Sequence, residues 1–386
     1  MTPLSDHSDR PPPTTPTTTT EQPRPQPPDT ATNGVRLRPN TSERVSAEGG
    51  DPAERARAVL EPAHWDFFAG GAGAERTLRA NVEAFARRRI VPRVLRGVGE
   101  RDLWTTVLGH DLSMPVMVAP TAFHQLAHPS GESGTAGAVA SAGTAMVVSM
   151  AANQPIEEIA ATGAQLWFQL YPQPDTEFQQ HVIKRAEAAG CRALVVTVDS
   201  PVFGRRERDR RNGFSDLPDG FACENMRDAT GRVRDIAMDA SLSWAHVDRL
   251  RQTTSLSIVL KGILHPVDAR LAVEHGVDGL IVSNHGGRQL DGAIATLDAL
   301  PAVAEAVDGH IPVLLDGGAR SGTDVLVALA LGASAVLIGR PVLWALATGG
   351  TGGVRELLEA LRDELDHALA LAGARRPADL TADLIA

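Results

Sequence analysis

The chain has 386 residues, of which 43% are hydrophobic and 22% are charged, a composition that suits one large globular core. Its formal net charge of −10 argues against a nucleic-acid partner and against binding to an anionic membrane surface. Two cysteines, Cys191 and Cys223, are too few for a disulfide framework and do not show the spacing of metal ligands.

The sequence contains no apolar run of about 18 residues that would span a membrane. It also lacks a basic-then-apolar leader pattern at its start. We therefore expect a cytoplasmic protein with no membrane partner.

Residues 1–45 are rich in proline and threonine and contain few apolar side chains. Such a segment cannot offset the entropy lost on ordering, so we predict a disordered tail. A proline-rich docking ligand is the alternative interpretation of this segment.

Globular composition begins near Asp51 and continues to residue 386, which predicts a single folded domain over residues 50–386. Residues 51–60 carry an Asp N-cap followed by Pro, the signature of a helix start. Residues 64–85 then predict a helix, a glycine break and a second helix, so the domain opens with a helical extension.

After this extension, short apolar strands alternate with longer amphipathic helices, and the pattern occurs eight times. The predicted strands are residues 115–120, 145–150, 166–171, 193–199, 257–262, 279–284, 312–318 and 335–340. Eight strand–helix units predict an α/β fold of the (β/α)₈ TIM barrel class. A doubly wound open sheet is the competitor, but the turn after the first strand lacks its Gly-x-Gly-x-x-Gly pattern.

The connection after the fourth strand is unusually long, with about forty residues rich in Arg, Asp and Gly between the strand at 193–199 and residues 242–250. Connections of this length in a compact barrel commonly form lids over an active site. An insertion without a role is the alternative.

Polar residues and glycines cluster at the carboxyl ends of the predicted strands, which meet at one mouth of a barrel. They are Gln169, Tyr171, Thr197, Asp199, Arg206, Lys261, Ser283, His285, Arg288, Asp316, Gly317, Gly318, Arg320, Gly339 and Arg340. This set carries a surplus of positive charge within an acidic protein, which predicts that the mouth binds anions.

Two kinds of anion are expected at this mouth. The Gly-rich segments 316–322 and 338–341 follow the seventh and eighth strands, where barrels commonly bind phosphate, and Arg340 adds a charged fork. Glycines that only close tight turns are the alternative. Arg206 and Arg288 lie elsewhere around the mouth and, with the Tyr171 hydroxyl, suit a small carboxylate.

His285 and Asp199 provide the chemistry of a base. An imidazole oriented by a carboxylate is a general base near neutral pH. Lys261 is expected either to place a positive charge beside a developing anion or to form a Schiff base. A phosphate-bearing cofactor, a carboxylate substrate and a base together predict redox chemistry at a carbon next to a carboxylate.

The remaining histidines carry less weight. His124 and His128 follow the first strand and could line the mouth, but we favour surface or supporting positions for them. No His, Asp or Glu cluster has the spacing of metal ligands, so no catalytic metal is expected.

The motif SNHGGRQLDG (283–292) and segments 197–209, 260–263, 315–325 and 338–341 occur in the order typical of one family. From about Ala53 to its end, the chain resembles the FMN-dependent α-hydroxy-acid oxidase/dehydrogenase family, which includes glycolate oxidase, lactate oxidase, mandelate dehydrogenase and hydroxymandelate oxidase. The resemblance implies an FMN cofactor and a homo-oligomer, typically a tetramer.

The resemblance also implies roles for individual residues. The substrate would contact Tyr171, Arg206 and Arg288, with His285 as base, Asp199 supporting it, and Lys261 near the flavin ring. The implied FMN-binding residues are Pro120, Thr121, Ala122, Ser149, Gln169, Thr197, Lys261, Ser283, Asp316, Gly317, Gly318, Ala319, Arg320, Gly339 and Arg340.

Two positions of the substrate pocket depart from the glycolate oxidase pattern. Phe67 stands where the family usually has a tyrosine whose hydroxyl contacts the substrate carboxylate, and losing that bond costs about 1 kcal/mol. Ala151 stands where glycolate oxidases have a tryptophan that narrows the pocket. A substrate bulkier than glycolate is therefore expected, with an aryl group as one candidate.

The implied reaction is oxidation of an (S)-2-hydroxy acid to the 2-oxo acid, with flavin reoxidised by O₂ to give H₂O₂. Ala122, near the flavin edge by family resemblance, leaves room for O₂. A dehydrogenase that passes electrons to a quinone or a protein carrier is the main alternative. An FMN-dependent isomerase, which would need basic residues for a diphosphate, and a non-catalytic binding barrel are weaker alternatives.

Overall fold

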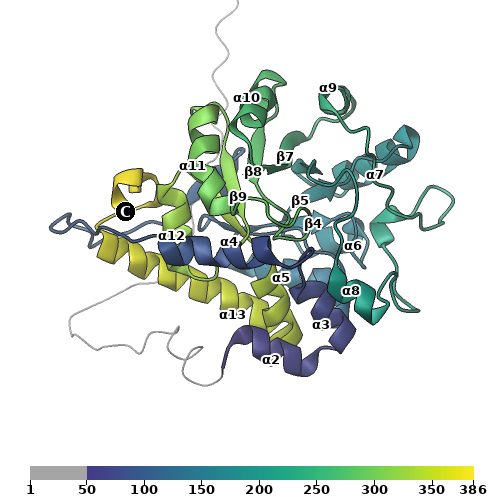
Figure 1. Cartoon of the computed structure of the whole chain (residues 1–386), viewed down its shortest axis with the longest axis horizontal. Helices are drawn as coiled ribbons and strands as arrows, with labels where there is room; N and C mark the ends of the chain where they lie inside the picture. Colours follow the sequence, from purple (N-terminus) through teal and green to yellow (C-terminus); the bar gives the residue numbers. More distant parts are fainter. Residues whose placement is uncertain (1–49) are drawn as a thin grey trace, which may run out of the picture. The chain divides into compact units, whose positions relative to one another are not determined.

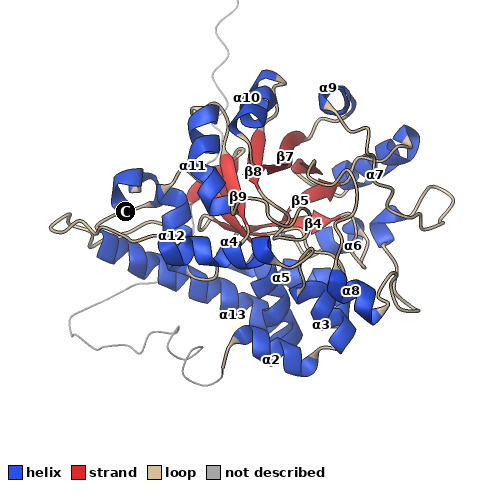
Figure 2. Ribbon diagram, in the orientation of Figure 1, coloured by secondary structure: helices blue, strands red, loops and turns tan. Residues whose placement is uncertain are grey.

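The computed structural model describes residues 50–386, and these form a closed barrel of eight parallel strands (Figures 1 and 2). The strands are β3 (Val116–Val118), β4 (Ala145–Ser149), β5 (Gln165–Leu170), β6 (Ala193–Thr197), β7 (Ser257–Ile263), β8 (Gly279–Val282), β9 (Val313–Asp316) and β10 (Ala335–Ile338). Each strand pairs with the next along the chain, and β10 closes the barrel against β3. The predicted (β/α)₈ barrel is confirmed, whereas the predicted tail over residues 1–45 lies outside the described residues.

Helices surround the strands, as Figure 2 shows. The helices that follow the eight strands in turn are α5 (Gly131–Ala142), α6 (Ile156–Ala160), α7 (Thr176–Ala188), α9 (Trp244–Thr253), α10 (Pro266–Glu274), α11 (Thr296–Val307), α12 (Gly322–Ala330) and α13 (Arg340–Ala372). The last of these bends at Gly350, whose φ of 55° and ψ of −145° interrupt the helix. None of the helices in the described range is long and apolar enough to cross a membrane.

The strands are buried on both faces, which explains their nearly continuous Val, Ile and Leu content. Alternate residues point into the barrel, where Met117, Val147, Trp167 and Val259 belong to one interior cluster. The other strand residues pack outward against the helices in a second, larger cluster. Two hydrophobic layers therefore hold the strand ends in fixed positions around the mouth.

A small hairpin closes the barrel at the amino ends of its strands. It consists of β1 (Thr105–Val107) and β2 (His110–Leu112), which pair antiparallel. Val107 and Leu112 belong to the interior cluster, and Gln165, at the start of β5, donates a 2.9 Å hydrogen bond to the Asp111 carbonyl. The carboxyl ends of the strands lie at the opposite end.

The predicted helical extension consists of α2 (Pro52–Val59), α3 (Pro62–Ala69) and α4 (Arg76–Arg87). Asp51 caps α2 by accepting a 3.0 Å bond from the Ala53 amide, and Pro52 occupies the first helical position as expected. Helix α3 packs against α8 (Glu207–Asn212) from the long connection, and the two lie together on one side of the molecule in Figure 1.

The long connection between β6 and α9 is confirmed, and part of it is firmly anchored. The Arg185 Nη1 atom on α7 donates to the carbonyl oxygens of Glu224, Asn225 and Arg227 at 3.2, 3.3 and 3.4 Å. The buried Asn225 side chain also accepts a 2.8 Å bond from the Ile156 amide. These contacts fix the segment around a 3₁₀ turn at Glu224–Met226 against α6 and α7.

Gly318 provides a direct test of how closely the turn after β9 packs against α4. Its φ is 102°, and a Cβ atom there would overlap the backbone carbonyl oxygen of Asn81. Gly163 also has a positive φ, 77°, but a Cβ atom there would meet no atom within 4 Å. We expect Gly163→Ala to lower the free energy of unfolding by about 1 kcal/mol and Gly318→Ala by about 3 kcal/mol. Equal losses in urea unfolding would contradict the close approach.

Candidate functional site

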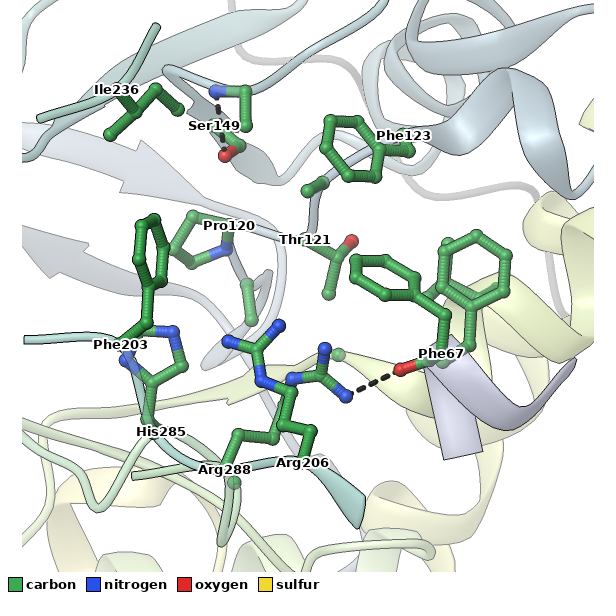
Figure 3. Close-up of a pocket in the computed structure, with 18 of the residues that line it drawn as sticks. Phe67, Pro120, Thr121, Phe123, Ser149, Phe203, Arg206, Ile236, His285 and Arg288 are labelled. Carbon is green, nitrogen blue, oxygen red and sulfur yellow. Dashed lines mark hydrogen bonds between the residues drawn. The ribbon is translucent and has the colours of Figure 1, made fainter. Parts of the chain in front are cut away.

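A cavity of about 730 Å³ lies at the carboxyl ends of the barrel strands. Figure 3 shows His285, Arg206 and Arg288 on one side of it and Ile236 and Phe123 on the opposite side. The predicted site residues that line this cavity are Phe67, Pro120, Thr121, Ala122, Ser149, Ala151, Tyr171, Arg206, Lys261, His285, Arg288, Asp316, Gly317, Gly318, Ala319, Arg320, Gly339 and Arg340. Residues from all eight strand ends therefore converge, as the barrel prediction requires.

Four predicted site residues lie behind the cavity wall and hold residues that line it. Gln169 accepts a 3.2 Å bond from the Ser149 hydroxyl and donates a 3.1 Å bond to Thr197. Ser283 accepts a 3.0 Å bond from the Lys261 ammonium group. Asp199, the fourth, bonds to the imidazole of His285.

The backbone of the turn after β8 determines where His285 points. His285, Gly286 and Gly287 all have left-handed φ values, of 61°, 62° and 75°. Glycine adopts this conformation readily, whereas a histidine there is uncommon and indicates a functional constraint. The His285 amide donates a 3.0 Å bond to Ser283 Oγ, which holds the turn closed.

The His285 ring is held between Asp199 and Tyr171. Its Nδ1 atom lies 3.0 Å from Asp199 Oδ1, and its Nε2 atom lies 3.3 Å from the Tyr171 hydroxyl. Because a carboxylate only accepts hydrogen bonds, Nδ1 carries the hydrogen and Nε2 accepts from Tyr171. This arrangement leaves the unprotonated nitrogen facing the cavity.

Burial and neighbouring charges set the protonation of this pair. Burial lowers the pKa of His285, Asp199 opposes this effect, and the positive charges of Lys261 and Arg206 reinforce it. Burial alone would raise the pKa of Asp199, but His285, Lys261 and Ser200 outweigh it, so that pKa is lowered. The pair at neutral pH is a carboxylate beside a neutral imidazole.

Lys261 is a buried ammonium group in an ion pair. Its Nζ atom lies 3.2 Å from Asp316 Oδ2. Burial would lower the pKa of Lys261, but the charges of Asp316 and Asp199 outweigh burial and raise it. Of the two roles expected for this lysine, the charged form favours a fixed positive charge over a Schiff base, which requires a neutral amine.

Arg206 and Arg288 both lie close to one aromatic ring. The Arg288 Cζ atom is 4.9 Å from the centroid of the Phe67 ring, and the Arg206 Cζ atom is 5.9 Å from it. Arg288 also donates a short hydrogen bond to the Phe67 carbonyl oxygen. Phe67 lacks the hydroxyl of a tyrosine, yet it contacts both guanidinium groups through its ring.

Negative charge is scarce around these two arginines. The nearest carboxylate oxygen to Arg206 in the described chain is Asp209 Oδ2, at 3.9 Å from Nη1. Burial lowers the pKa of Arg288 well below its usual value, and the positive charges of Arg206 and Arg340 lower it further. An anionic group that enters the cavity would therefore be bound strongly.

A second positive region lies beside the turns after β9 and β10. Arg340 donates to the carbonyl oxygens of Phe68, Gly286 and Gly70 at 2.9, 3.0 and 2.8 Å. Burial and then the charge of Arg320 lower the pKa of Arg340 to about 9. Within residues 50–386, no carboxylate forms an ion pair with Arg320 or with Arg340.

These residues fit FMN. A phosphate group beside Arg320 and Arg340 would supply the missing negative charge, and the glycine-rich turns allow close approach of backbone amides. The buried Asp316 Oδ1 atom has no hydrogen-bond partner among the described residues, so it can accept from a ligand hydroxyl or N–H group. No group of three or more His, Cys, Asp or Glu residues in the described range is arranged to hold a metal ion.

An aromatic wall is the main feature that the sequence analysis missed. Six of the nine phenylalanines line the cavity: Phe67, Phe68, Phe123, Phe203, Phe214 and Phe221. The last three belong to the long connection. Three phenylalanines within a polar loop of a predicted lid were a signal that this loop contributes to the site.

The sequence analysis also left His124 without a specific role. The structure confirms a supporting position, because this histidine is fully buried and its Nε2 atom lies 2.6 Å from the Thr121 hydroxyl. Burial lowers the pKa of His124 to about 4, so the ring is neutral. Its other nitrogen, Nδ1, lies 2.9 Å from the Thr135 hydroxyl.

Comparisons with known proteins agree with this geometry. Residues 56–386 match the family described as FMN-dependent dehydrogenase. The chain is 46% identical to 2-hydroxyacid oxidase 1 of Mus musculus over 340 residues, which cover 84% of this chain and 92% of that protein. It is 46% identical to L-lactate oxidase of Nostoc sp. over 343 residues, covering 84% and 94% of the two chains. A structure of mandelate oxidase with benzoyl-formic acid is 44% identical and has a TM-score of 0.81, covering 87% and 96%.

The electrostatic coupling between His285 and Asp199 can be measured directly. Because Asp199 raises the pKa of His285 against the effect of burial, Asp199→Asn is expected to lower that pKa further. NMR titration of the imidazole measures the change. Asp248→Asn, at the separate pair with His275, is the control and is expected to leave the His285 titration unmoved. An unchanged titration in Asp199→Asn would refute the coupling.

Proposed function

Because the chain belongs to the FMN-dependent dehydrogenase family, we propose that it oxidises an (S)-2-hydroxy acid to the corresponding 2-oxo acid, with O₂ as electron acceptor and H₂O₂ as product. One observation carries the proposal: a neutral imidazole, oriented by a carboxylate, lines the same cavity as two guanidinium groups that have only one carboxylate, Asp209, close to them. A 2-hydroxy acid has a carboxylate that the guanidinium groups can bind and a neighbouring hydroxyl-bearing carbon that can lie beside the imidazole.

Arg206 and Arg288 bind the substrate carboxylate in this proposal. Both groups contact the Phe67 ring, and the single carboxylate near them, Asp209, leaves a net positive charge for the ligand. The Tyr171 hydroxyl, which donates to His285 Nε2 in the free protein, would donate its one hydrogen to the substrate carboxylate instead, which frees Nε2 for the substrate. The carboxylate is thus fixed in orientation as well as position.

His285 takes a proton from the substrate at Nε2. Asp199 holds the ring through Nδ1 and stabilises the imidazolium that forms. FMN, when bound, supplies the two-electron acceptor. Lys261 would hold a fixed positive charge beside the flavin ring, where it would stabilise the negative charge of the reduced cofactor.

The proposed FMN site extends from β3 to β10 around the mouth. Residues proposed to contact the cofactor are Pro120, Thr121, Ala122, Ser149, Lys261, Asp316, Gly317, Gly318, Ala319, Arg320, Gly339 and Arg340. Gln169, Thr197 and Ser283 are proposed to hold the Ser149 and Lys261 side chains toward it.

The substrate is proposed to be bulkier than glycolate and to carry an aryl group. Ala151 contributes only a methyl group to the cavity, and the phenylalanines supply an apolar wall beside it. The structural relatives include a mandelate oxidase seen with benzoyl-formic acid, an aryl 2-oxo acid. Aromatic walls favour aryl groups through offset stacking and edge contacts.

O₂ is proposed as the acceptor because the similar curated proteins are named oxidases. A dehydrogenase that uses a quinone or protein carrier would show slow flavin reoxidation in air, so this property separates the two. We further propose that residues 50–386 form one catalytic domain, that the protein is cytoplasmic, and that it assembles as a homotetramer. The family resemblance supports the assembly.

Removal of the proposed base tests the mechanism. His285→Ala is expected to slow anaerobic bleaching of the 450 nm flavin absorption by 2-hydroxy acids about 10²- to 10⁴-fold, the usual contribution of a general base. Flavin content measured before mixing is the control for cofactor loss. Bleaching at the wild-type rate would exclude His285 as the base.

The pH dependence of kcat/KM provides a second test. His285 must be unprotonated to accept a proton, and its pKa lies below the usual value of 6.5. The rate is therefore expected to fall as the pH drops through that lowered pKa, with the acid limb below pH 6.5. An acid limb above pH 7 would contradict the neutral imidazole.

A further inference from the structure

Phe123 has a backbone conformation that phenylalanine rarely adopts. It follows β3 by a few residues, and its φ of 63° lies in the left-handed region. A bulky residue in this region is an outlier that persists only where surrounding contacts enforce it. The conformation therefore requires a restraint nearby.

The restraint is a buried carboxylate on α5. Glu132 is fully buried, and its Oε1 atom accepts a 3.0 Å bond from the amide of His124, the residue that follows Phe123. The same oxygen accepts a 3.0 Å bond from the Asn153 amide in the turn after β4. The Phe123 amide itself donates a 3.3 Å bond to the Ala151 carbonyl oxygen. Glu132 thus joins the two turns from which Phe123 and Ala151 reach the cavity.

The restraint directs the Phe123 ring into the cavity. Its centroid lies 5.3 Å from that of Phe67, with 29° between the ring planes. In Figure 3 the Phe123 ring lies on the side of the pocket away from His285 and Arg206. A substrate whose carboxylate is bound by the arginines would direct its side chain toward this part of the pocket.

We propose that Phe123 determines specificity by packing against an aryl group on the substrate, and that Glu132 is the positioning residue that holds Phe123 in place. The inference rests on the proposed function and identifies which residues would select its substrate. The small Ala151 leaves the space, and Phe123 provides the aromatic surface at its edge.

Phe123→Leu tests the role of the ring. Leucine has the same backbone cost at a positive φ, so the variant removes only the aromatic surface. The ratio of kcat/KM for (S)-mandelate to that for (S)-lactate is expected to fall about tenfold, equivalent to about 1.4 kcal/mol. Phe168→Leu is the matched control, because Phe168 is a buried phenylalanine of β5 that does not line the cavity. It is expected to leave the ratio at its wild-type value.

Two substitutions of Glu132 test the positioning role. Glu132→Gln keeps the acceptor oxygen and is expected to keep the mandelate-to-lactate ratio, whereas Glu132→Ala removes both hydrogen bonds and is expected to lower it as Phe123→Leu does. The double variant Phe123→Leu/Glu132→Ala should show no further fall, because the two residues act through the same ring. Should Glu132→Ala fail to fold, Glu132→Asp, one methylene shorter, replaces it.

The outcomes separate this inference from the proposed function. A wild-type protein that oxidises both acids, with an unchanged ratio in Phe123→Leu, overturns the inference and leaves the oxidation standing. If Glu132→Ala, or Glu132→Asp in its place, folds and keeps the wild-type mandelate-to-lactate ratio, the positioning role of Glu132 is overturned. A wild-type protein whose flavin is bleached by no 2-hydroxy acid overturns the proposed function itself.

Discussion

The site depends on buried positive charge that the protein itself neutralises only in part. Arg206, Arg288 and Arg340 are placed where burial lowers their pKa values, and the nearest carboxylate oxygen to Arg206 is 3.9 Å away. Burying a charge without a partner is costly in free energy, and a bound anion offsets that cost. The surplus of positive charge therefore supports the proposal that the cavity binds one phosphate and one carboxylate.

The barrel tolerates this surplus because neutral groups hold the arginines. Carbonyl oxygens of Phe68, Gly70 and Gly286 accept from Arg340, and the Phe67 carbonyl and ring hold Arg288. Carbonyl oxygens and π faces attract a cation without cancelling its charge. The N-terminal helix α3 supplies most of these groups, so this extension is a part of the site and not only a cover for the barrel.

Much of this arrangement could be predicted from the sequence because parallel strands bring their carboxyl ends together. Arg206 and Arg288 are far apart in the chain, yet the strand count alone placed them at one mouth. The roles of Glu132, Phe123 and the loop phenylalanines could not be predicted in this way. They depend on contacts between turns, such as the two backbone amides that donate to one Glu132 oxygen. They also depend on the left-handed backbone of Phe123. The periodic pattern of apolar residues in a sequence predicts neither feature. Similarly, residue type alone cannot distinguish Gln169 and Thr197, which lie behind the wall, from Ser149, which lines it.

The charges proposed to bind the substrate and the cofactor also affect the pKa of His285, the proposed base. Arg206 and Lys261 lower the pKa of His285, which keeps the imidazole neutral and able to accept a proton before a substrate arrives. A bound carboxylate cancels part of that positive field, so the pKa of His285 rises once the substrate is in place. In the proposed mechanism the imidazole would then be a stronger base when the substrate is bound, while the Asp199 carboxylate keeps its orientation fixed. Electrostatics would therefore couple substrate binding to proton transfer in the proposed mechanism, with no change in the fold required.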